Sequence, residues 1–378
     1  MPYKVPFVNY PEHYRRIWDE VLGAITEVLS RGDLILRDQL RHFEENIASF
    51  IGVKYAVGLN SGTDALYLSL KAAGLGPGDE VITVAHTFVA SVAVIVHCGA
   101  TPILIDVGED HNMDVDQVEK AISPRTKAIM PVHLNGRLCD MGKLMKIAVK
   151  HNLIVIEDAA QALGASLDGK KAGSFGLTGC FSFYPAKILG TAGDGGILTT
   201  NSEDVAEKVR LLRDHGQRRA TGDILFYGFN SRLDNLLAAI LDVKLKHLPE
   251  WIERRRELAA LYHRGLSKLS SVKLPPPSGS QNRYFDVFTN YVIRARERDR
   301  LVAYLKEQSI EVLISWPKPM HHHDALNLRH FKLPMTEQIS SEVISLPLFP
   351  ELSNQQIEFV IDTIHKFYRG TGNPCVKG

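Results

Sequence analysis

Short apolar segments alternate with segments of helical periodicity between residues 55 and 200, and this alternation constrains the fold more than any other feature. It is typical of a mainly parallel β-sheet with helices on both faces. Helices are predicted at 64–73, where Gly74 should end the helix, and at 141–151. The sequence therefore predicts an α/β fold with a seven-stranded sheet, its strands at 55–59, 80–84, 102–106, 127–132, 153–157, 179–184 and 196–200.

A second, smaller unit is predicted after the sheet. A helix is expected at 202–215 and another from 233 to about 269, with a break between Leu248 and Pro249. Strands are expected at 290–294 and 312–315, on either side of a charged helix at 296–308. We therefore predict a large domain over residues 1–245 and a smaller α+β domain over residues 246–378.

The charge balance and the cysteines exclude several classes of protein. The 378 residues include 44 Lys and Arg and 43 Asp and Glu, so the net charge of +1 gives no reason to expect nucleic acid or a membrane as a partner. No stretch approaches the roughly twenty apolar residues that span a bilayer. A cytoplasmic protein is expected, because the four cysteines are scattered and form no C-x-x-C pair: Cys98, Cys139, Cys180 and Cys375.

One lysine stands among small and apolar neighbours just after a predicted strand. Residues 179–196 read Gly-Cys-Phe-Ser-Phe-Tyr-Pro-Ala-Lys-Ile-Leu-Gly-Thr-Ala-Gly-Asp-Gly-Gly, which places Lys187 after a proline turn. An amine that is partly removed from water has a lowered pKa, so it can attack an aldehyde and later act as a general base. The alternative is a solvated loop lysine, the usual state of this residue. The glycine-rich context favours a catalytic lysine.

A carboxylate lies where the apolar run of the strand 153–157 stops. Ligands of open α/β sheets bind beyond the carboxyl ends of the strands, and Asp158 is at such an end. There it could keep a pyridine nitrogen protonated, which makes pyridoxal phosphate an effective electron sink. The alternative, equally supported by this segment alone, is that Asp158 caps a helix beginning at Ala159.

A phosphate site is indicated between the first strand and the helix after it, where residues 60–64 read Asn-Ser-Gly-Thr-Asp. Free N–H groups and the helix dipole at such a helix start bind phosphate, although a serine or threonine there is more often only an N-cap. The chain contains no Walker A sequence, and Gly74-x-Gly76 follows a helix where a Rossmann fingerprint follows a strand. Nucleotide hydrolysis and dehydrogenase functions therefore lose their main support.

Three consecutive histidines, at 321–323, suggest either a metal site or a substrate contact. Consecutive side chains alternate in direction along an extended chain and do not share one face of a helix, so no metal is expected. A substrate contact by His321, His322 or His323 is the favoured interpretation, with ordinary loop solvation as the alternative.

Four motifs, in this order, resemble those of the DegT/DnrJ/StrS sugar aminotransferases. They are Ser-Gly-Thr-Asp-Ala-Leu at 61–66, His-Thr-Phe-Val-Ala-Ser at 86–91, Glu-Asp-Ala-Ala-Gln at 157–161 and Phe-Ser-Phe-Tyr-Pro-Ala-Lys at 181–187. The resemblance covers nearly the whole chain, from Val-Pro-Phe at 5–7 to Leu-Pro-Leu-Phe-Pro at 346–350. It implies the fold of pyridoxal-phosphate-dependent transferases of type I, with a seven-stranded sheet that agrees with the strands predicted above.

The resemblance also implies roles for eight residues around pyridoxal 5′-phosphate. Lys187 would form the internal aldimine and move the proton, and Asp158 would pair with the pyridine nitrogen. Phe88 would stack on the ring, and Gln161 would lie near the phenolic oxygen. Three further residues of the chain and one of the partner subunit in a homodimer would bind the phosphate: Gly62, Thr63, Ser182 and Asn230.

The implied reaction has two halves, and pyridoxamine phosphate links them. An amino acid, L-glutamate by expectation, would convert the cofactor to pyridoxamine phosphate, which would then aminate a keto-sugar linked to a nucleotide. The family usually has glutamine at the position of Leu237 and often an aromatic residue at that of Asn135, so these positions leave the sugar unassigned. We expect both, with His321, His322 and His323, to line the sugar pocket.

Two other functions remain open on the sequence alone. An aminotransferase with the same cofactor motifs could act on a cyclitol or another cyclic ketone that carries no nucleotide. A regulatory or binding protein could also retain the scaffold, because a fold does not establish an activity. The presence of Lys187, Asp158 and Ser182 together favours the enzyme.

Overall fold

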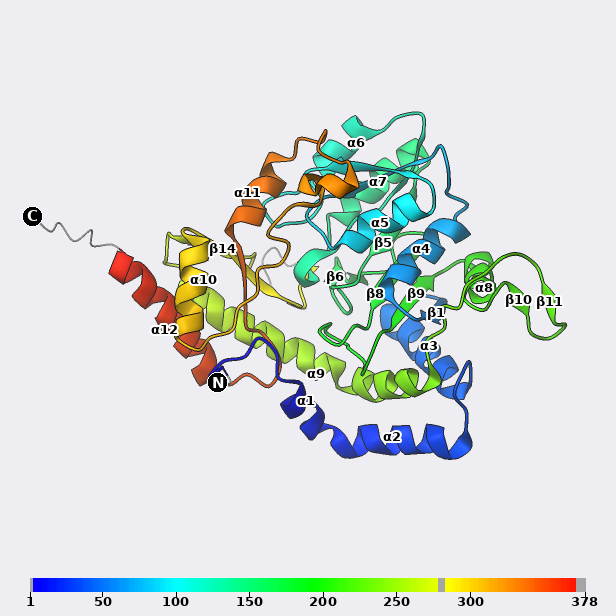
Figure 1. The fold of residues 1–378 in the computed structure, drawn as a ribbon, viewed down its shortest axis with the longest axis horizontal. Helices are drawn as coiled ribbons and strands as arrows, with labels where there is room; N and C mark the ends of the chain where they lie inside the picture. Colours follow the sequence, from blue (N-terminus) through cyan, green and yellow to red (C-terminus); the bar gives the residue numbers. More distant parts are fainter. Residues whose placement is uncertain (1–2, 278–282, 372–378) are drawn as a thin grey trace, which may run out of the picture.

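A computed structural model describes residues 3–277 and 283–371 of the chain (Figure 1). Within these ranges, no helix has both the length and the apolar character needed to cross a bilayer. Cys98, Cys139 and Cys180 are free and buried, whereas Cys375 lies outside the described residues.

A seven-stranded sheet forms the centre of the fold, as the sequence predicts (Figure 1). Within it, β9 runs antiparallel to its neighbours, and the other adjacent pairs are parallel. The spatial order is β1 (Tyr55–Leu59), β9 (Gly196–Thr200), β8 (Thr178–Ser182), β5 (Ile154–Asp158), β4 (Thr126–Ile129), β2 (Glu80–Val84) and β3 (Thr101–Ile105).

Helices cover both faces of this sheet because both sides of its strands are apolar. Successive side chains of a strand point to opposite faces, so Ala56 and Val57 of β1 belong to different apolar clusters. One cluster includes α4 (Gly62–Ala72), α5 (Val89–His97) and α8 (Glu203–Leu212). The other includes α3 (Asp38–Ile51), α7 (Met141–His151) and the first part of α9 (Asn235–Leu266).

Helix α4 shows why these elements begin and end where they do. The hydroxyl of Ser61 accepts a hydrogen bond from the backbone N–H of Asp64 at 3.0 Å, which confirms the N-cap interpretation. After the last turn, Gly74 adopts a φ of +78°, a conformation that favours glycine, so the predicted stop is confirmed. The helix thus starts directly at the end of β1 and points its N-terminus past the sheet edge.

The break predicted between Leu248 and Pro249 is wrong. Helix α9 is continuous over 32 residues with Pro249 inside it. A proline removes one backbone hydrogen bond, but Leu245, Leu248 and Trp251 are buried on either side of it and hold the helix to the core.

The C-terminal region contains a three-stranded antiparallel sheet in the order β12 (Val272–Lys273), β14 (Tyr291–Ala295) and β15 (Val343–Leu346). The strand predicted at 312–315 is wrong, because this segment makes only a single bridge between Leu313 and Ser345. Strand β15, which the sequence reading missed, takes its place beside β14. Three helices pack around this sheet: α10 (Arg298–Glu307), α11 (Pro334–Glu342) and α12 (Asn354–Thr371).

The C-terminal region has its own apolar cluster, to which the second half of α9 contributes from Leu258 onward. The first residues of the chain join it, since Val5 forms a parallel bridge with Ile310 and is buried in the same cluster. The large cluster ends on α9 at Ile252. A domain boundary near residue 245 stays a prediction.

Short elements complete the described chain. Strands β10 (Gln217–Arg218) and β11 (Asp223–Ile224) form a hairpin that extends away from the sheet at the right of Figure 1. A small antiparallel sheet has the order β13 (Tyr284–Phe285), β6 (Ser166–Leu167), β7 (Lys170–Lys171). The remaining helices are α1 (Tyr10–Arg16), α2 (Trp18–Arg31), α6 (Val118–Ala121), η1 (Val115–Gln117), η2 (Leu134–Gly136), η3 (Met320–His322) and η4 (Asp324–Leu326).

Candidate active site

A cavity of about 650 Å³, here called the lysine cavity, opens beyond the carboxyl ends of the central strands. This is where open α/β sheets bind ligands. Its wall comes from the ends of β5 and β8, the first turns of α4 and α5, and two loops around residues 184–187 and 313–316. Seven of the predicted cofactor residues lie in this one wall: Gly62, Thr63, Phe88, Asp158, Gln161, Ser182 and Lys187.

Lys187 is held in a tight loop between β8 and β9. Its backbone N–H donates to the carbonyl of Tyr184 at 2.9 Å, and a Cβ on Gly190 would lie only 2.3 Å from the carbonyl oxygen of Pro185. Burial lowers the pKa of the Lys187 ammonium, and the negative charge of Asp158 opposes that shift. The geometry thus supplies an amine that loses its proton more easily than an exposed lysine.

Asp158 ends β5 with its carboxylate in the wall of the lysine cavity. Its Oδ2 accepts a hydrogen bond from the hydroxyl of Ser91 at 2.7 Å, and the hydroxyls of Ser91 and Thr87 are 2.8 Å apart. The alternative that Asp158 caps a helix is wrong: residues 159–164 form turns, in which the N–H of Ala160 contacts Oδ1 at 3.2 Å. The carboxylate is therefore oriented by α5 and remains available to the cavity.

The neighbouring carboxylate, Glu157, has a different environment. It is fully buried and accepts hydrogen bonds from three backbone N–H groups, those of Gly173, Phe175 and Gly176, at 2.7–2.9 Å. Nε2 of His133 contacts it at 3.0 Å. Neighbouring residues of a strand face opposite ways. Glu157 therefore holds the loop at 173–176 by hydrogen bonds, whereas Asp158 faces the cavity.

The end of the cavity near α4 is suited to an anion. Gly62 and Thr63 form the first turn of this helix, whose free N–H groups and dipole favour negative charge. The helix approaches β8 so closely that a Cβ on Gly62 would lie 2.8 Å from the Cβ of Ser182. Glycine at this position therefore brings the helix start and the Ser182 hydroxyl into one polar corner.

Two further residues of the cavity wall, Gln161 and Phe88, differ in whether their side chains are held by other residues. The side-chain oxygen of Gln161 accepts a hydrogen bond from the backbone N–H of Asn135 at 2.8 Å, and its carbonyl accepts one from Thr289 at 2.6 Å. Phe88, in contrast, is 59% exposed at the start of α5. A large aromatic ring left this open inside a cavity offers an apolar face to a flat ligand.

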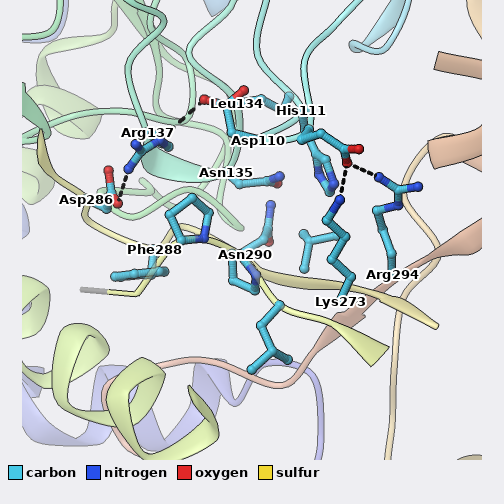
Figure 2. A pocket seen from close by; sticks show the side chains of 15 residues that line it. Asp110, His111, Leu134, Asn135, Arg137, Lys273, Asp286, Phe288, Asn290 and Arg294 are labelled. Atoms are coloured by element: carbon cyan, nitrogen blue, oxygen red, sulfur yellow. Dashed lines mark hydrogen bonds and ion pairs between the residues drawn. The ribbon is translucent and has the colours of Figure 1, made fainter. Parts of the chain in front are cut away.

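The residues predicted for a sugar pocket are not brought to the lysine cavity. Asn135 lines a second cavity, whose wall shares Leu134 with that of the lysine cavity (Figure 2). Leu237 packs against the large apolar cluster, because the first turns of α9 lie against the core. The three histidines His321, His322 and His323 are also absent from the cavity wall, since His321 turns inward to contact Glu337 at 3.1 Å.

Asn230 lies outside this cavity as well. It is exposed and forms a bridge with Asp214 beside the β10–β11 hairpin. Arg232 contacts the same Asp214 at 2.9 Å. Within one chain, these residues do not complete the site.

The structure adds wall residues that the sequence reading missed. Thr87 is one of them, and Ser91, although outside the wall, orients Asp158. Both lie in the His-Thr-Phe-Val-Ala-Ser motif at 86–91, and two hydroxyl side chains four residues apart were the available signal. Tyr184, Asn290 and Trp316 also line the cavity, but they come from loops that only tertiary packing brings together.

Known proteins are similar to this chain over nearly its whole length. A sequence model described as the DegT/DnrJ/EryC1/StrS aminotransferase family matches residues 16–365. A protein of Geobacillus stearothermophilus named "Pleiotropic regulatory protein" is 42% identical over 97% of this chain and 99% of its own. The dTDP-3-amino-3,4,6-trideoxy-alpha-D-glucose transaminase of Streptomyces venezuelae is 40% identical over 96% of each chain.

A solved structure also matches closely. The crystal structure of S. venezuelae DesV in complex with a ketimine intermediate has a TM-score of 0.93 and 40% sequence identity, and the match covers 97% of this chain and 99% of that chain. The family match over most of the chain, these relatives and the shared fold lead to one conclusion: the chain belongs to the DegT/DnrJ/EryC1/StrS aminotransferase family.

Proposed function

We propose that this protein transfers an amino group from L-glutamate to the keto group of a nucleotide-linked deoxysugar, with pyridoxal 5′-phosphate as cofactor. The observation that carries the proposal is the meeting of Lys187, Asp158 and an anion-binding helix start in one cavity. The S. venezuelae relative, named as a transaminase of a dTDP-linked amino sugar, supplies the substrate class.

The wall residues fit the parts of this cofactor. Gly62, Thr63 and Ser182 would hold the phosphate, and the exposed ring of Phe88 would cover one face of the pyridine. Asp158 would contact the ring nitrogen, because it is the carboxylate that faces the cavity. The close approach of Gly62 to Ser182 leaves the helix start free of side chains on that side, which favours direct contact of an anion with backbone N–H groups.

Bound pyridoxal phosphate supplies an electron sink that stabilises negative charge on the carbon losing or gaining a proton. Lys187 would bond the cofactor through Nζ and, once released, move a proton with the same nitrogen, since its lowered pKa makes the neutral amine accessible. Asp158 would hold a proton at the pyridine nitrogen. Ser91 would keep the Asp158 carboxylate in that orientation through the 2.7 Å hydrogen bond.

We also propose a homodimer in which each lysine cavity receives Asn230 from the partner subunit. The β10–β11 hairpin and the residues after it expose apolar side chains, including Tyr227, which is 99% exposed, and Ile224 and Leu225. Exposed apolar groups on a projecting hairpin favour burial against another chain. Asn230 follows directly and lies outside the cavity of its own chain.

The experiment that tests the cofactor and the donor is an absorption spectrum of purified protein. A band from lysine-bound pyridoxal phosphate should be present and should disappear when L-glutamate is added, as the cofactor becomes pyridoxamine phosphate. Borohydride treatment before digestion should label the peptide that contains Lys187. A protein that binds no cofactor, or whose band does not respond to any amino acid, would contradict the proposal.

A regulatory function is the second candidate, because a relative with 42% identity carries a regulatory name. The two candidates differ in turnover: an enzyme consumes glutamate in proportion to aminated sugar, whereas a regulator bleaches the cofactor band at most once. An aminotransferase for cyclitols is distinguished by competition, since nucleoside diphosphates should inhibit only an enzyme whose pocket accommodates a nucleotide.

A further inference from the structure

Three side chains outside the lysine cavity converge on one point. His321 and His322 belong to η3, and Glu337 belongs to α11. One ligand atom of each lies within 4.8 Å of the other two. Nε2 of His321 is 3.1 Å and Nε2 of His322 is 3.4 Å from the same oxygen, Oε1 of Glu337. Two imidazoles and a carboxylate thus surround a single position.

This arrangement could not be read from the histidine run. Consecutive histidines alternate in direction along an extended chain and do not share one face of a helix, so no metal was expected from the run alone. In the structure, residues 320–322 form a 3₁₀ turn that places the rings of His321 and His322 4.3 Å apart, centre to centre. The third group, Glu337, comes from another helix.

The separations match those between the ligands of a tetrahedral metal ion. Zinc binds imidazole nitrogen and carboxylate oxygen at about 2.0–2.2 Å, so ligand atoms at the corners of a tetrahedron are about 3.4 Å apart. The two distances from Oε1 of Glu337, 3.1 and 3.4 Å, are close to this value. An ion can therefore be bound with only small movements of the three side chains.

Access from solvent also suits a metal. The side chain of His321 is fully buried, whereas those of His322 and Glu337 are 38% and 42% exposed, so an ion can enter from solvent.

We propose that His321, His322 and Glu337 bind one divalent transition-metal ion of the zinc class, with water completing its coordination. Two nitrogen ligands and one oxygen ligand favour such an ion over magnesium or calcium, which prefer oxygen alone. This inference goes beyond the transaminase activity and does not depend on it.

The ion would link two segments that are hydrogen-bonded to residues directly after β2 and β3. The backbone N–H of Met320, next to His321, donates to the carbonyl of Ala85 at 3.3 Å, three residues before Phe88. At the start of α11, the N–H groups of Met335 and Thr336 donate to the carboxylate of Asp106 at 2.8 Å. A metal between η3 and α11 should therefore stabilise the folded protein without entering the chemistry.

Isothermal titration of Zn²⁺ into cofactor-loaded, tag-free protein that has been treated with a chelator tests the site. Every protein in the series carries Cys375→Ser, so that this thiol adds no affinity. We expect one ion per chain, at least tenfold weaker binding in His322→Ala and in Glu337→Gln, and unchanged binding in the matched control His323→Ala. Zinc should also raise the melting temperature of the parent protein but not of the two ligand variants.

The cofactor absorption band shows in each case that the variant is folded. Absence of saturable zinc binding to the parent protein would overturn the proposal. Equal affinity in the parent and in both ligand variants would overturn it too, because the ion would then be bound elsewhere.

Discussion

Two cavities share Leu134 and Asn290 in their walls, and they differ in size and in whether their charged groups are paired with one another. The lysine cavity has room for a cofactor and a substrate, with a volume of about 650 Å³. The second cavity has about 30 Å³, enough for one or two water molecules, although its wall is more densely charged (Figure 2).

The charges of the second cavity are largely satisfied by one another. Glu109 contacts both Lys273 and Arg294, and Arg137 contacts Asp286 at 2.7 Å (Figure 2). In the lysine cavity, the amine of Lys187 instead has a pKa lowered by burial. A dense group of charges can thus serve only to hold segments of the fold together. A few polar groups that face an open cavity can instead react with a ligand.

The largest expected effect is that of Lys187→Ala on turnover. Under the proposed role, loss of the amine that would bond the cofactor and move the proton should lower kcat/KM for the overall reaction by about 10⁴-fold, while the unfolding free energy changes little. Steady-state kinetics and urea unfolding measure the two quantities. Lys171→Met is the matched control, because burial also lowers the pKa of Lys171, which lies outside the cavity. Similar activity losses in both variants would contradict a catalytic role that belongs to Lys187 alone.

The next largest effect concerns stability and belongs to the second cavity. Arg137→Met leaves Asp286 buried without its cationic partner, so the free energy of unfolding should fall by about 3–5 kcal/mol. The cofactor band and kcat per folded molecule should stay close to those of the parent protein. Addition of Asp286→Asn should recover part of the stability; a large loss of kcat with unchanged stability would instead give this cavity a role in the chemistry.

Asp158→Asn should lower kcat by about 10²-fold in both half-reactions, because an amide cannot hold a proton at the pyridine nitrogen as a carboxylate does. Rapid mixing with glutamate and with the keto-sugar separates the two halves. Glu157→Gln is the neighbouring control: it should reduce stability, since Glu157 accepts three backbone hydrogen bonds, and leave the chemistry of the folded fraction intact. A reversed pattern would mean that the roles of the two carboxylates are exchanged.

The pH dependence of cofactor addition tests how burial and the charge of Asp158 act on Lys187. The neutral amine is the form that adds pyridoxal phosphate, so a pKa of Lys187 below the ordinary value moves the rise of the addition rate to lower pH. The negative charge of Asp158 stabilises the ammonium, so Asp158→Asn should lower this pKa further and shift the profile again toward acid. Addition rates of cofactor to apoprotein, measured across pH, give the midpoints. A shift toward alkali in the variant would contradict the assigned interaction.

The smallest expected effect is that of Lys273→Ala, at the edge of the second cavity. Lys273 and Glu109 are both about half exposed, and solvent-exposed ion pairs contribute about 0–1 kcal/mol. Unfolding in urea should therefore detect a loss within that range, and added salt should reduce it. A loss of several kcal/mol would show that the pair is coupled to the buried Arg294.

The sequence predicts the parts of this molecule that depend on local pattern. Strands β1, β2 and β9 have the predicted bounds, and nearly all of their residues are buried, as expected for strands covered on both faces. Lys187 and Asp158 were identified from where strands stop, and parallel strands bring such ends to one edge. The structure places both in the same cavity wall, although their roles stay predictions.

The sequence is least informative where side-chain direction depends on distant segments. The three histidines at 321–323 lie outside the wall of the lysine cavity, and His321 contacts Glu337 of α11, so their place in a sugar pocket stays a prediction. Strand β15 was missed because its pairing with β14 joins segments about fifty residues apart, which no local pattern reveals. Asn135, which has a φ of +58°, lies in the wall of the second cavity.

The bridge between Val5 and Ile310 has a consequence for the order of events during synthesis. Two residues after Val5, Phe7 lines the lysine cavity, and its N–H is held by the carboxylate of Glu311 at 2.8 Å. The chain leaves the ribosome from its N-terminus, so this first segment has no place to dock until residues 309–311 have also emerged. The seven-stranded sheet can assemble earlier, but a nascent chain cannot close its lysine cavity until most of its length has been translated.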